Sequence, residues 1–309
     1  MVYDLSTPLV IGISSRALFN LEEENQIFET EGLTAYSAYQ LAHEKDVLPR
    51  GAGFEMIRNF LELNRLDDTR RLVEVIIMSR NSADTSLRIF NSIKAYGLDI
   101  TRAALTGGAA VSNYLRAFKT DLFLSAYEPD VQDAINAGVA AARLLTGSAV
   151  QAHHGSQIRI AFDGDAVLFG AEAERVYQHD GMNAFREHEQ IHAEEPLPKG
   201  PFANFLMMLS NIQDMYPERE GAPIRTALVT SRGAPAHERA IRTLRAWHVR
   251  VDEAFFLGGV QKKDVLQSFG ADIFFDDQSV HTDPAAEVVP SALVPYRSGD
   301  DPRTQEKEV

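Results

Sequence analysis

The sequence contains no cysteine, and this absence excludes disulfide bonds and thiolate metal sites. It also lacks a long apolar run, since none approaches the roughly 20 residues that span a bilayer. The first residues carry no Lys or Arg ahead of their short apolar run, unlike a secretory signal. From these absences we expect a soluble, cytoplasmic protein with no membrane partner.

Basic residues are scarce, because 30 Lys and Arg stand against 44 Asp and Glu, for a net charge of −14. This balance argues against a nucleic-acid polymer as partner, since binding along its backbone requires a basic face. A small phosphorylated substrate stays open, because a few fixed donors and a bound cation can reverse the local field. The 309 residues suffice for two ordinary domains or one large one. The polar segment 298–309 is predicted to be a disordered tail.

An internal repeat organises the chain. In each half an apolar strand and a helix lead to a second strand that ends in Gly-Gly, and a helix and another strand follow. Equivalent residues stand 151 positions apart, as Gly107 does from Gly258 and Asp121 from Asp272. Short apolar strands that alternate with longer helices predict parallel β–α–β units. We therefore predict an α/β protein of two related Rossmann-like halves with parallel sheets. The predicted ranges are 1–150 and 151–297, with a small helical insertion at about 170–222; a single sheet shared by both halves is the alternative.

Two carboxylates follow the predicted strand 159–162, in the run Asp163-Gly164-Asp165. Ligands of open α/β sheets bind at the carboxyl ends of strands. Here one carboxylate can attack phosphorus, and the other can donate and accept the proton of the leaving group and of water. Gly164 allows a tight turn that brings backbone N–H groups close to phosphate oxygens. Taken alone, the same run is more typical of a solvated turn.

Polar residues also follow three further predicted strands along the chain. Thr230, with Ser231 after it, ends one apolar strand and is predicted to open a helix; Lys262 and Lys263 follow a Gly-Gly pair; Asp276 and Asp277 end a last strand. Singly, these residues fit a helix cap, a surface pair and a loop. Together they predict a site that holds phosphate and Mg²⁺, which prefers carboxylate oxygens.

This order of strand ends resembles the four motifs of the haloacid-dehalogenase-type (HAD-like) phosphohydrolases. Around the motifs the sequence is similar, more particularly, to the cytosolic 5′-nucleotidase I family. The likeness covers nearly the whole chain. The segments that carry it are Ser14–Phe19, Phe162–Phe169, Glu187–Glu189, Pro196–Pro201, Leu228–Arg232 and Phe274–Gln278.

The resemblance implies Mg²⁺-dependent hydrolysis of nucleoside 5′-monophosphates, AMP or similar, through an aspartyl-phosphate. By position, Asp163 is expected to be the nucleophile and Asp165 the general acid and base. Asp163, the backbone carbonyl of Asp165 and Asp276 are expected to ligate Mg²⁺, with Asp277 in support. The residues expected to hold the phosphoryl group are Gly164, Thr230, Ser231 and Lys262, with Lys263 as the alternative lysine.

The first half lacks these groups at the equivalent positions, where Ser14 stands for Asp163 and Arg16 for Asp165. We therefore predict that it is catalytically silent. Two roles stay open for it. It either only buries apolar surface, or binds a regulatory nucleotide or contacts substrate through Ser14, Ser15 and Arg16. Subunit number is also open, a homo-oligomer included.

Two other functions are alternatives to the phosphatase. The whole chain could be a catalytically weak, nucleotide-binding regulatory protein. Alternatively, His188-Glu189-Gln190-Ile191-His192 matches the H-E-x-x-H pattern of zinc metalloproteases, in which both histidines lie on one face of a helix. No Gly-x-x-His completes an extended zinc motif, although Glu218 or Glu220 could be proposed as a third ligand, and the phosphatase remains the favoured function.

Overall fold

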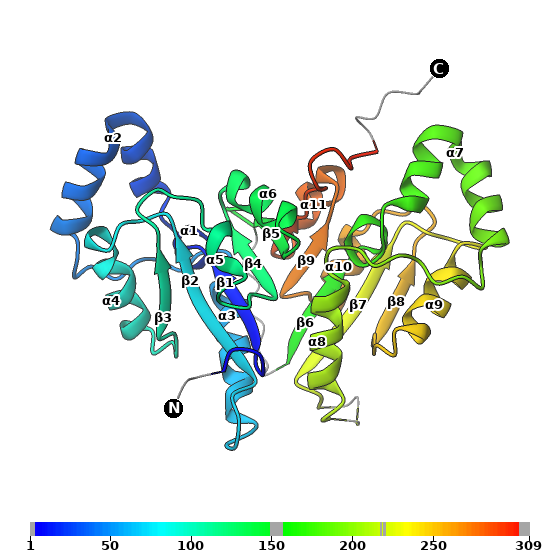
Figure 1. Ribbon diagram of the computed structural model, residues 1–309, viewed down its shortest axis with the longest axis horizontal. Coiled ribbons are helices and arrows are strands. Elements are labelled where there is room, and N and C mark those ends of the chain that lie inside the picture. The colour runs from blue at the N-terminus through cyan, green and yellow to red at the C-terminus, as the bar shows by residue number, and fades with distance from the viewer. Residues whose placement is uncertain (1–3, 149–156, 217, 219–220, 303–309) are drawn as a thin grey trace.

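Ten strands form one sheet in the computed structural model, which describes residues 4–148, 157–216, 218 and 221–302. The strand order is β3-β2-β1-β4-β5-β10-β9-β6-β7-β8 (Figure 1). The elements of the first half are β1 (Leu9–Ile13), α1 (Ser15–Leu18), α2 (Glu22–Ala42), α3 (Phe54–Glu62), β2 (Val73–Ser79), α4 (Leu87–Ala95), β3 (Arg102–Leu105), α5 (Ser112–Leu115), β4 (Leu122–Ser125), α6 (Glu128–Asn136) and β5 (Ala140–Leu144). Those of the second half are β6 (Ile158–Phe162), α7 (Glu172–Ile191), α8 (Ala203–Gln213), β7 (Ile224–Thr230), α9 (His237–Ala246), β8 (Glu253–Phe256), α10 (Lys263–Phe269), β9 (Ile273–Asp276), α11 (Ser279–Ala286) and β10 (Ser291–Leu293).

The two halves have the same strand order. Neighbouring strands are parallel within each half, and one antiparallel pair, β5 with β10, joins the halves through the registered residues Ala292 and Leu144. The predicted α/β class with a mostly parallel sheet is thus confirmed. Of the two arrangements left open by the sequence, the single shared sheet is the one observed.

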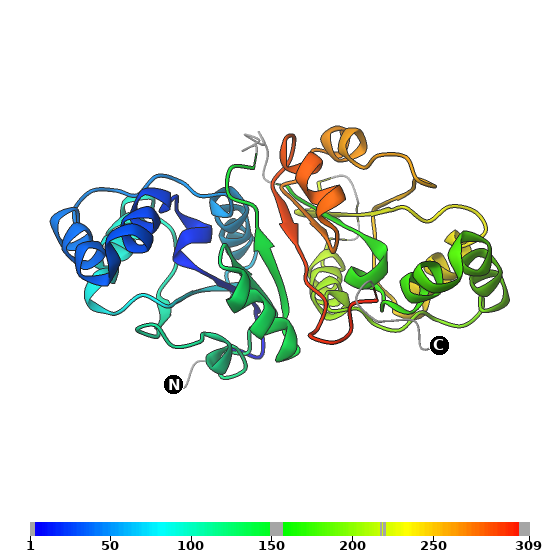
Figure 2. The same cartoon turned by 90° about the horizontal axis from the view of Figure 1, so that it is seen from above.

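The repeat extends to details of backbone geometry. Helices α2 and α7 are each broken by a glycine, Gly32 with φ 83° and ψ −177° and Gly181 with φ 80° and ψ −177°. This backbone region is almost exclusive to glycine. The two helices therefore change direction at equivalent points. They lie at the two outer ends of the molecule, on the same side (Figures 1 and 2).

The predicted insertion at 170–222 comprises α7 and α8. Both helices have counterparts in the first half, α2 and α3, so the segment belongs to the repeat and is not peculiar to the second half. Residues 303–309 of the predicted tail lie outside the described residues. At the start of that tail, the Ser298 backbone N–H donates to Asn136 Oδ1 at 2.9 Å.

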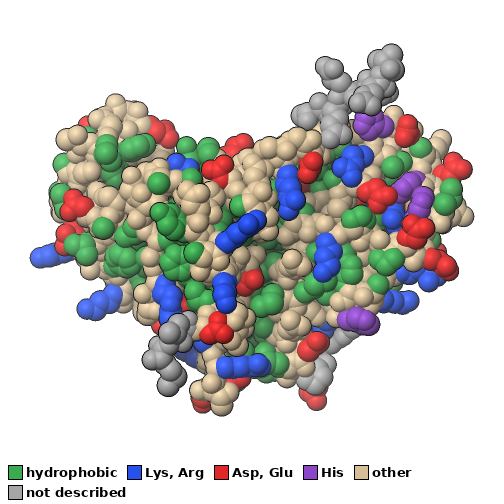
Figure 3. All heavy atoms as spheres, viewed as in Figure 1, with side chains coloured by type: hydrophobic (Ala, Val, Ile, Leu, Met, Phe, Trp, Pro, Cys, Tyr) green, Lys and Arg blue, Asp and Glu red, His purple; other side chains and the backbone are tan. Residues whose placement is uncertain are grey.

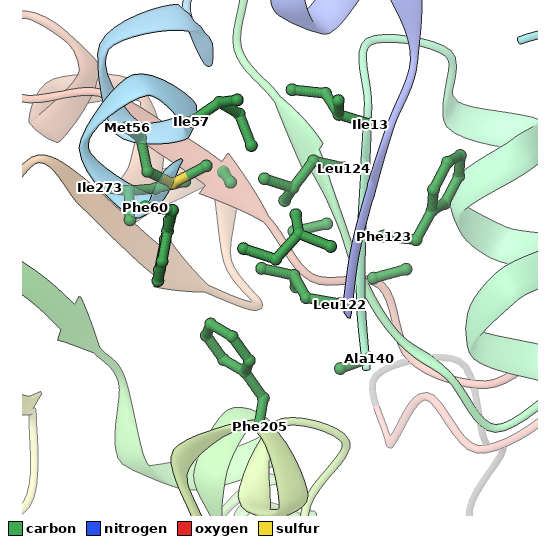
Figure 4. Close-up of a cluster of buried hydrophobic side chains, with 14 of the residues drawn as sticks. Ile13, Met56, Ile57, Phe60, Leu122, Phe123, Leu124, Ala140, Phe205 and Ile273 are labelled. Carbon is green, nitrogen blue, oxygen red and sulfur yellow. The ribbon is translucent and has the colours of Figure 1, made fainter. Parts of the chain in front are cut away.

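The surface is mixed in charge, and the core is continuous across the halves. Acidic and basic side chains are interspersed over the face shown in Figure 3. In the interior, the buried Met56, Ile57 and Phe60 of α3 lie beside Ile273 and Phe205 of the second half (Figure 4). Because these side chains share one core, the halves are expected to stabilise each other. Among the described residues, every helix is too short or too polar to cross a membrane.

Candidate active site

The site lies where three neighbouring parallel strands end. Asp163 directly follows β6, Asp276 is the last residue of β9, and Thr230 is the last residue of β7. Strand β6 lies between β7 and β9, at the point where the strand order of the second half reverses. Ligands of open α/β sheets bind at such reversals. The Asp163 backbone N–H donates to the Phe275 carbonyl at 2.8 Å, which fixes the start of the turn beside β9.

Lys262 joins the carboxylates from the start of α10. Its Nζ lies 2.7 Å from Asp163 Oδ1 and 2.6 Å from Asp276 Oδ2, and the side chain is buried. Burial alone would lower the pKa of Lys262, but the two carboxylates hold that pKa above its ordinary value. Lys263 instead pairs with Glu287 at 2.5 Å. The structure therefore directs Lys262 toward the carboxylates and Lys263 away from them.

Three buried carboxylates could hold a metal ion. Asp163, Asp276 and Asp277 each offer a ligand atom, and these atoms lie within 4.8 Å of one another. Asp277 Oδ2 accepts from the Tyr296 hydroxyl at 2.5 Å, whereas its Oδ1 is buried without a hydrogen-bond partner in the described part of the chain. A buried oxygen of this kind is costly unless something binds it. The donor set, all carboxylate oxygen, fits a hard cation such as Mg²⁺.

The pKa values reflect the crowding of negative charge. Burial raises the pKa of Asp163 to about 7, with Lys262 opposing and Asp276 adding to the rise. Burial and the two neighbouring carboxylates also place the pKa of Asp277 well above its ordinary value. For Asp276 burial acts in the same direction, but Lys262 and His281 hold the pKa below its ordinary value. A divalent cation would relieve this repulsion.

Gly164 and Thr230 approach each other closely beside this cluster. A Cβ on Gly164 would lie 3.1 Å from Thr230 Oγ1, so glycine allows the turn Gly164–Leu168 to pack against β7. Thr230 is buried, and its Oγ1 accepts from the Arg232 backbone N–H at 3.2 Å. The prediction that Thr230 opens a helix was wrong, because α9 begins only at His237. Ser231 is exposed at the surface.

Asp165 meets a partner that the sequence did not reveal. Arg232 binds its carboxylate through two parallel hydrogen bonds, Nε to Oδ2 at 2.8 Å and Nη2 to Oδ1 at 2.7 Å. Arg232 Nη1 also donates to Glu189 of α7, and Arg239 Nη1 donates to the other Glu189 oxygen at 2.8 Å. Arg232 and Glu189 both belong to segments that carry the family resemblance, but no pattern in the sequence indicates that they pair.

The same contacts account for the zinc-like pattern. Glu189 is fully buried between two guanidinium groups, so it is not available as a general base beside a metal. His192 Nδ1 lies 2.8 Å from the His188 backbone carbonyl oxygen, a contact within the helix. In the described ranges, the group suited to a metal is the Asp163 cluster. These contacts disfavour a zinc protease.

The equivalent strand end of the first half has different contacts. Ser14 Oγ accepts from the Ala17 N–H at 3.3 Å, Ser15 Oγ lies 3.1 Å from Ser79 Oγ, and Arg16 pairs with Glu22 at 2.7 Å. Four strands separate β1 from β6, a distance of roughly 24 Å at about 4.8 Å a strand. Arg16 lines a separate pocket of about 360 Å³ together with Arg50. Ser14, Ser15 and Arg16 are therefore not brought to the Asp163 cluster.

Buried carboxylates and a lysine at adjacent strand ends of a mostly parallel α/β sheet are compatible with a hydrolase of phosphate esters. Sequence comparison specifies the class. The model of the 5′-nucleotidase family matches residues 1–301, so the chain belongs to the 5′-nucleotidase family, a family of hydrolases. This confirms the resemblance found in the motifs.

Individual relatives agree with the family. The chain is 38% identical to "Cytosolic 5'-nucleotidase 1B" of Homo sapiens over 286 residues, which cover 90% of this chain and 47% of that protein. It thus spans about half the length of this curated relative. A chain of the solved "Structure of Pnkp1/Rnl/Hen1 complex" aligns over 94% of this chain and 97% of its own length, with a TM-score of 0.32 and 14% identity. That likeness is too low to support an argument.

Proposed function

We propose that the chain hydrolyses nucleoside 5′-monophosphates, AMP or similar, to a nucleoside and phosphate, with Asp163 as the nucleophile and Mg²⁺ as cofactor. The carrying observation is the buried cluster of Asp163, Asp276, Asp277 and Lys262 at the end of β6. Family membership supports the substrate class. Asp163, Asp276 and Asp277 would hold Mg²⁺, which when bound would neutralise charge on the transferring phosphoryl group.

The reaction would proceed in two displacements. In the first, an Asp163 oxygen attacks phosphorus, the bond from phosphorus to the 5′-oxygen breaks, and the leaving oxygen takes a proton from the Asp165 carboxyl group. In the second, water attacks the phosphorus of the aspartyl-phosphate, its proton passes to the Asp165 carboxylate, and the bond from phosphorus to the Asp163 oxygen breaks to release phosphate. Asp163 is then again a free carboxylate and Asp165 is again protonated, so both residues are ready for the next cycle.

Phosphoryl transfer depends mainly on positioning and on neutralising charge. Lys262 is buried and already lies at hydrogen-bond distance from Asp163, so its ammonium would face an oxygen of the transferring group. Thr230, Ser231 and the backbone N–H groups around Gly164 would hold the remaining oxygens. The close approach of Gly164 and Thr230 at the end of β7 supports the assignment of these two residues.

The two halves would then have different tasks. Residues 151–297 would form the catalytic, HAD-like half, and residues 1–150 a silent half that retains the strand order without the carboxylates. The position of Asp276 is taken by Ser125, and that of Lys262 by Val111. The name of the human relative, a cytosolic enzyme, supports placing this chain in the cytosol as well.

The test is phosphate release from a panel of nucleoside 5′-monophosphates with added Mg²⁺, for the wild type and Asp163→Asn. We expect the wild type to release phosphate. For the variant we expect kcat to be lower by at least about 1,000-fold, because the nucleophile is gone. Release that survives Asp163→Asn contradicts the mechanism. No release from any nucleotide by the wild type would favour the regulatory nucleotide-binding protein instead.

A further inference from the structure

A chain of buried ion pairs runs from Asp165 into helix α7. Arg232 binds Asp165 with two hydrogen bonds and Glu189 with a third, and Arg239 binds Glu189 from the other side. The Arg232 side chain is 1% exposed and that of Glu189 is 0% exposed, against 18% for Asp165. Arg232 also lies over the rings of Phe169 and Phe185, at 5.8 and 5.5 Å. Contacts on several sides therefore hold the Arg232 guanidinium in place.

The first half shows what the fold needs at these positions. Asn81 stands where Arg232 does, two residues after the end of the equivalent strand. Gln40 stands where Glu189 does, eight residues after the helix-breaking glycine. The same packing is thus built there without this pair of charges.

An arginine at one equivalent position makes a buried ion pair in both halves, although its carboxylate partners come from different positions of α2 and α7. Arg88 and Arg239 are equivalent, and each donates Nε to a backbone carbonyl at 3.0 Å, that of Asp46 and that of Glu195. Arg88 Nη1 binds the buried Glu24 at 2.5 Å. This contact ties α4 to α2 just as Arg239 ties α9 to α7, so it serves the fold in both places.

Burying charged pairs is expensive and rarely favours the fold over apolar replacements. The half without carboxylates at its strand end does without the Arg232–Glu189 pair, and the half with them has it. We propose that Arg232 is a positioning residue that fixes the carboxylate of Asp165 for proton transfer, and that Glu189 holds Arg232 in place from α7. This inference rests on the proposed function.

The two parallel hydrogen bonds from Arg232 fix the plane of the Asp165 carboxylate. Glu189 in turn holds the Arg232 guanidinium from α7. A displacement of about 1 Å at a reacting group can cost a factor of 100 in rate, so we expect loss of this positioning to have a large effect on the rate.

The test compares two substrates that differ only in the leaving atom. One is AMP, and the other is its analogue with sulfur in place of the bridging 5′-oxygen, because a thiolate leaves without being protonated. First-turnover rates and KM are measured for the wild type, Arg232→Met, Arg232→Lys and Glu189→Gln. We expect Arg232→Met to lower the first-turnover rate on AMP about 100-fold, at the lower end of general acid contributions. On the sulfur analogue the rate should fall less than threefold, with KM nearly unchanged for both; Arg232→Lys and Glu189→Gln should be intermediate on AMP.

Glu24→Gln is the matched control, because it removes the buried carboxylate that pairs with Arg88 in the silent half, away from the Asp163 cluster. Thermal unfolding shows that each variant is folded. Equal losses on both substrates, a gain on AMP, unchanged rates, or a loss in Glu24→Gln that matches Glu189→Gln would each overturn the positioning role. A wild type that hydrolyses neither substrate overturns the proposed function itself, a distinct outcome.

Discussion

Lys262 is the residue whose surroundings determine most of the chemistry. It is the cation that lies between Asp163 and Asp276, and both carboxylates are buried with it. Removing one partner from a buried ionic group leaves uncompensated charge, which costs about 3–5 kcal/mol. The adjacent Lys263 makes a partly exposed pair with Glu287, of a kind that contributes at most about 1 kcal/mol.

We therefore expect Lys262→Met, in metal-free protein at neutral pH, to lower the free energy of unfolding by about 3 kcal/mol, and Lys263→Met by less than about 1 kcal/mol. Urea denaturation followed by circular dichroism measures both. Similar values for the two variants would contradict the assigned contacts, because the two lysines are adjacent in sequence but differ in burial.

Asp277 provides a separate test of the cation at the residue scale. A ligand that binds only the folded state stabilises it by about 2.7 kcal/mol at 100 times its dissociation constant. We expect Mg²⁺ to raise the melting temperature of the wild type by several degrees, and that of Asp277→Asn much less. Calorimetry with Mg²⁺ and with chelator measures this, and an Asp277→Asn protein that gains as much as wild type removes Asp277 from the cation site.

At the scale of elements, strand ends could be predicted from the sequence and contacts between helices could not. Asp163, Asp276 and Thr230 follow buried apolar runs, and parallel neighbours bring such ends together. The choice between Lys262 and Lys263 required the start of α10, because adjacent helical residues point about 100° apart. The pairing of Arg232 with Glu189, 43 positions apart, leaves no periodic trace in the sequence.

Helix α7 is joined to the site through Glu189, and this contact predicts a pH dependence. Burial would raise the pKa of Glu189, but Arg232 and Arg239 hold that pKa below its ordinary value. A depressed pKa contributes stability above the unfolded value of about 4.3, and this stability is lost as pH falls through the folded value.

Glu189→Gln should therefore lower the free energy of unfolding by about 3–5 kcal/mol at pH 7, because two buried arginines lose their shared carboxylate. The difference from wild type should shrink as pH falls below 4, where wild-type Glu189 also becomes neutral. Urea denaturation at a series of pH values measures it. A difference that stays constant with pH would show that shape, not charge, is responsible.

At the scale of the whole molecule, the two halves share a core although only one carries the carboxylates. Phe60 of the first half is fully buried beside Ile273 and Phe205 of the second (Figure 4). Large-to-small changes at buried phenylalanines cost about 3–5 kcal/mol. Phe60→Ala should lower stability by this amount and leave a single cooperative unfolding transition by calorimetry. Two separate transitions, with the second half unaffected, would show that the halves fold independently.

Equivalent ion pairs in the two halves of the sheet have their charges exchanged between the strands. In the first half Glu74 of β2 binds Arg102 of β3 at 2.6 Å, and in the second half Arg225 of β7 binds Glu253 of β8 at 2.7 Å, at equivalent positions. A chain with two similar halves can misassemble while it folds, with a strand of one copy pairing in the other. Here such an exchange would place Glu74 against Glu253, or Arg225 against Arg102, and like charges on neighbouring strands repel. The reversed pairs are thus expected to disfavour pairing of β3 or β8 with the copy of its neighbour in the other half.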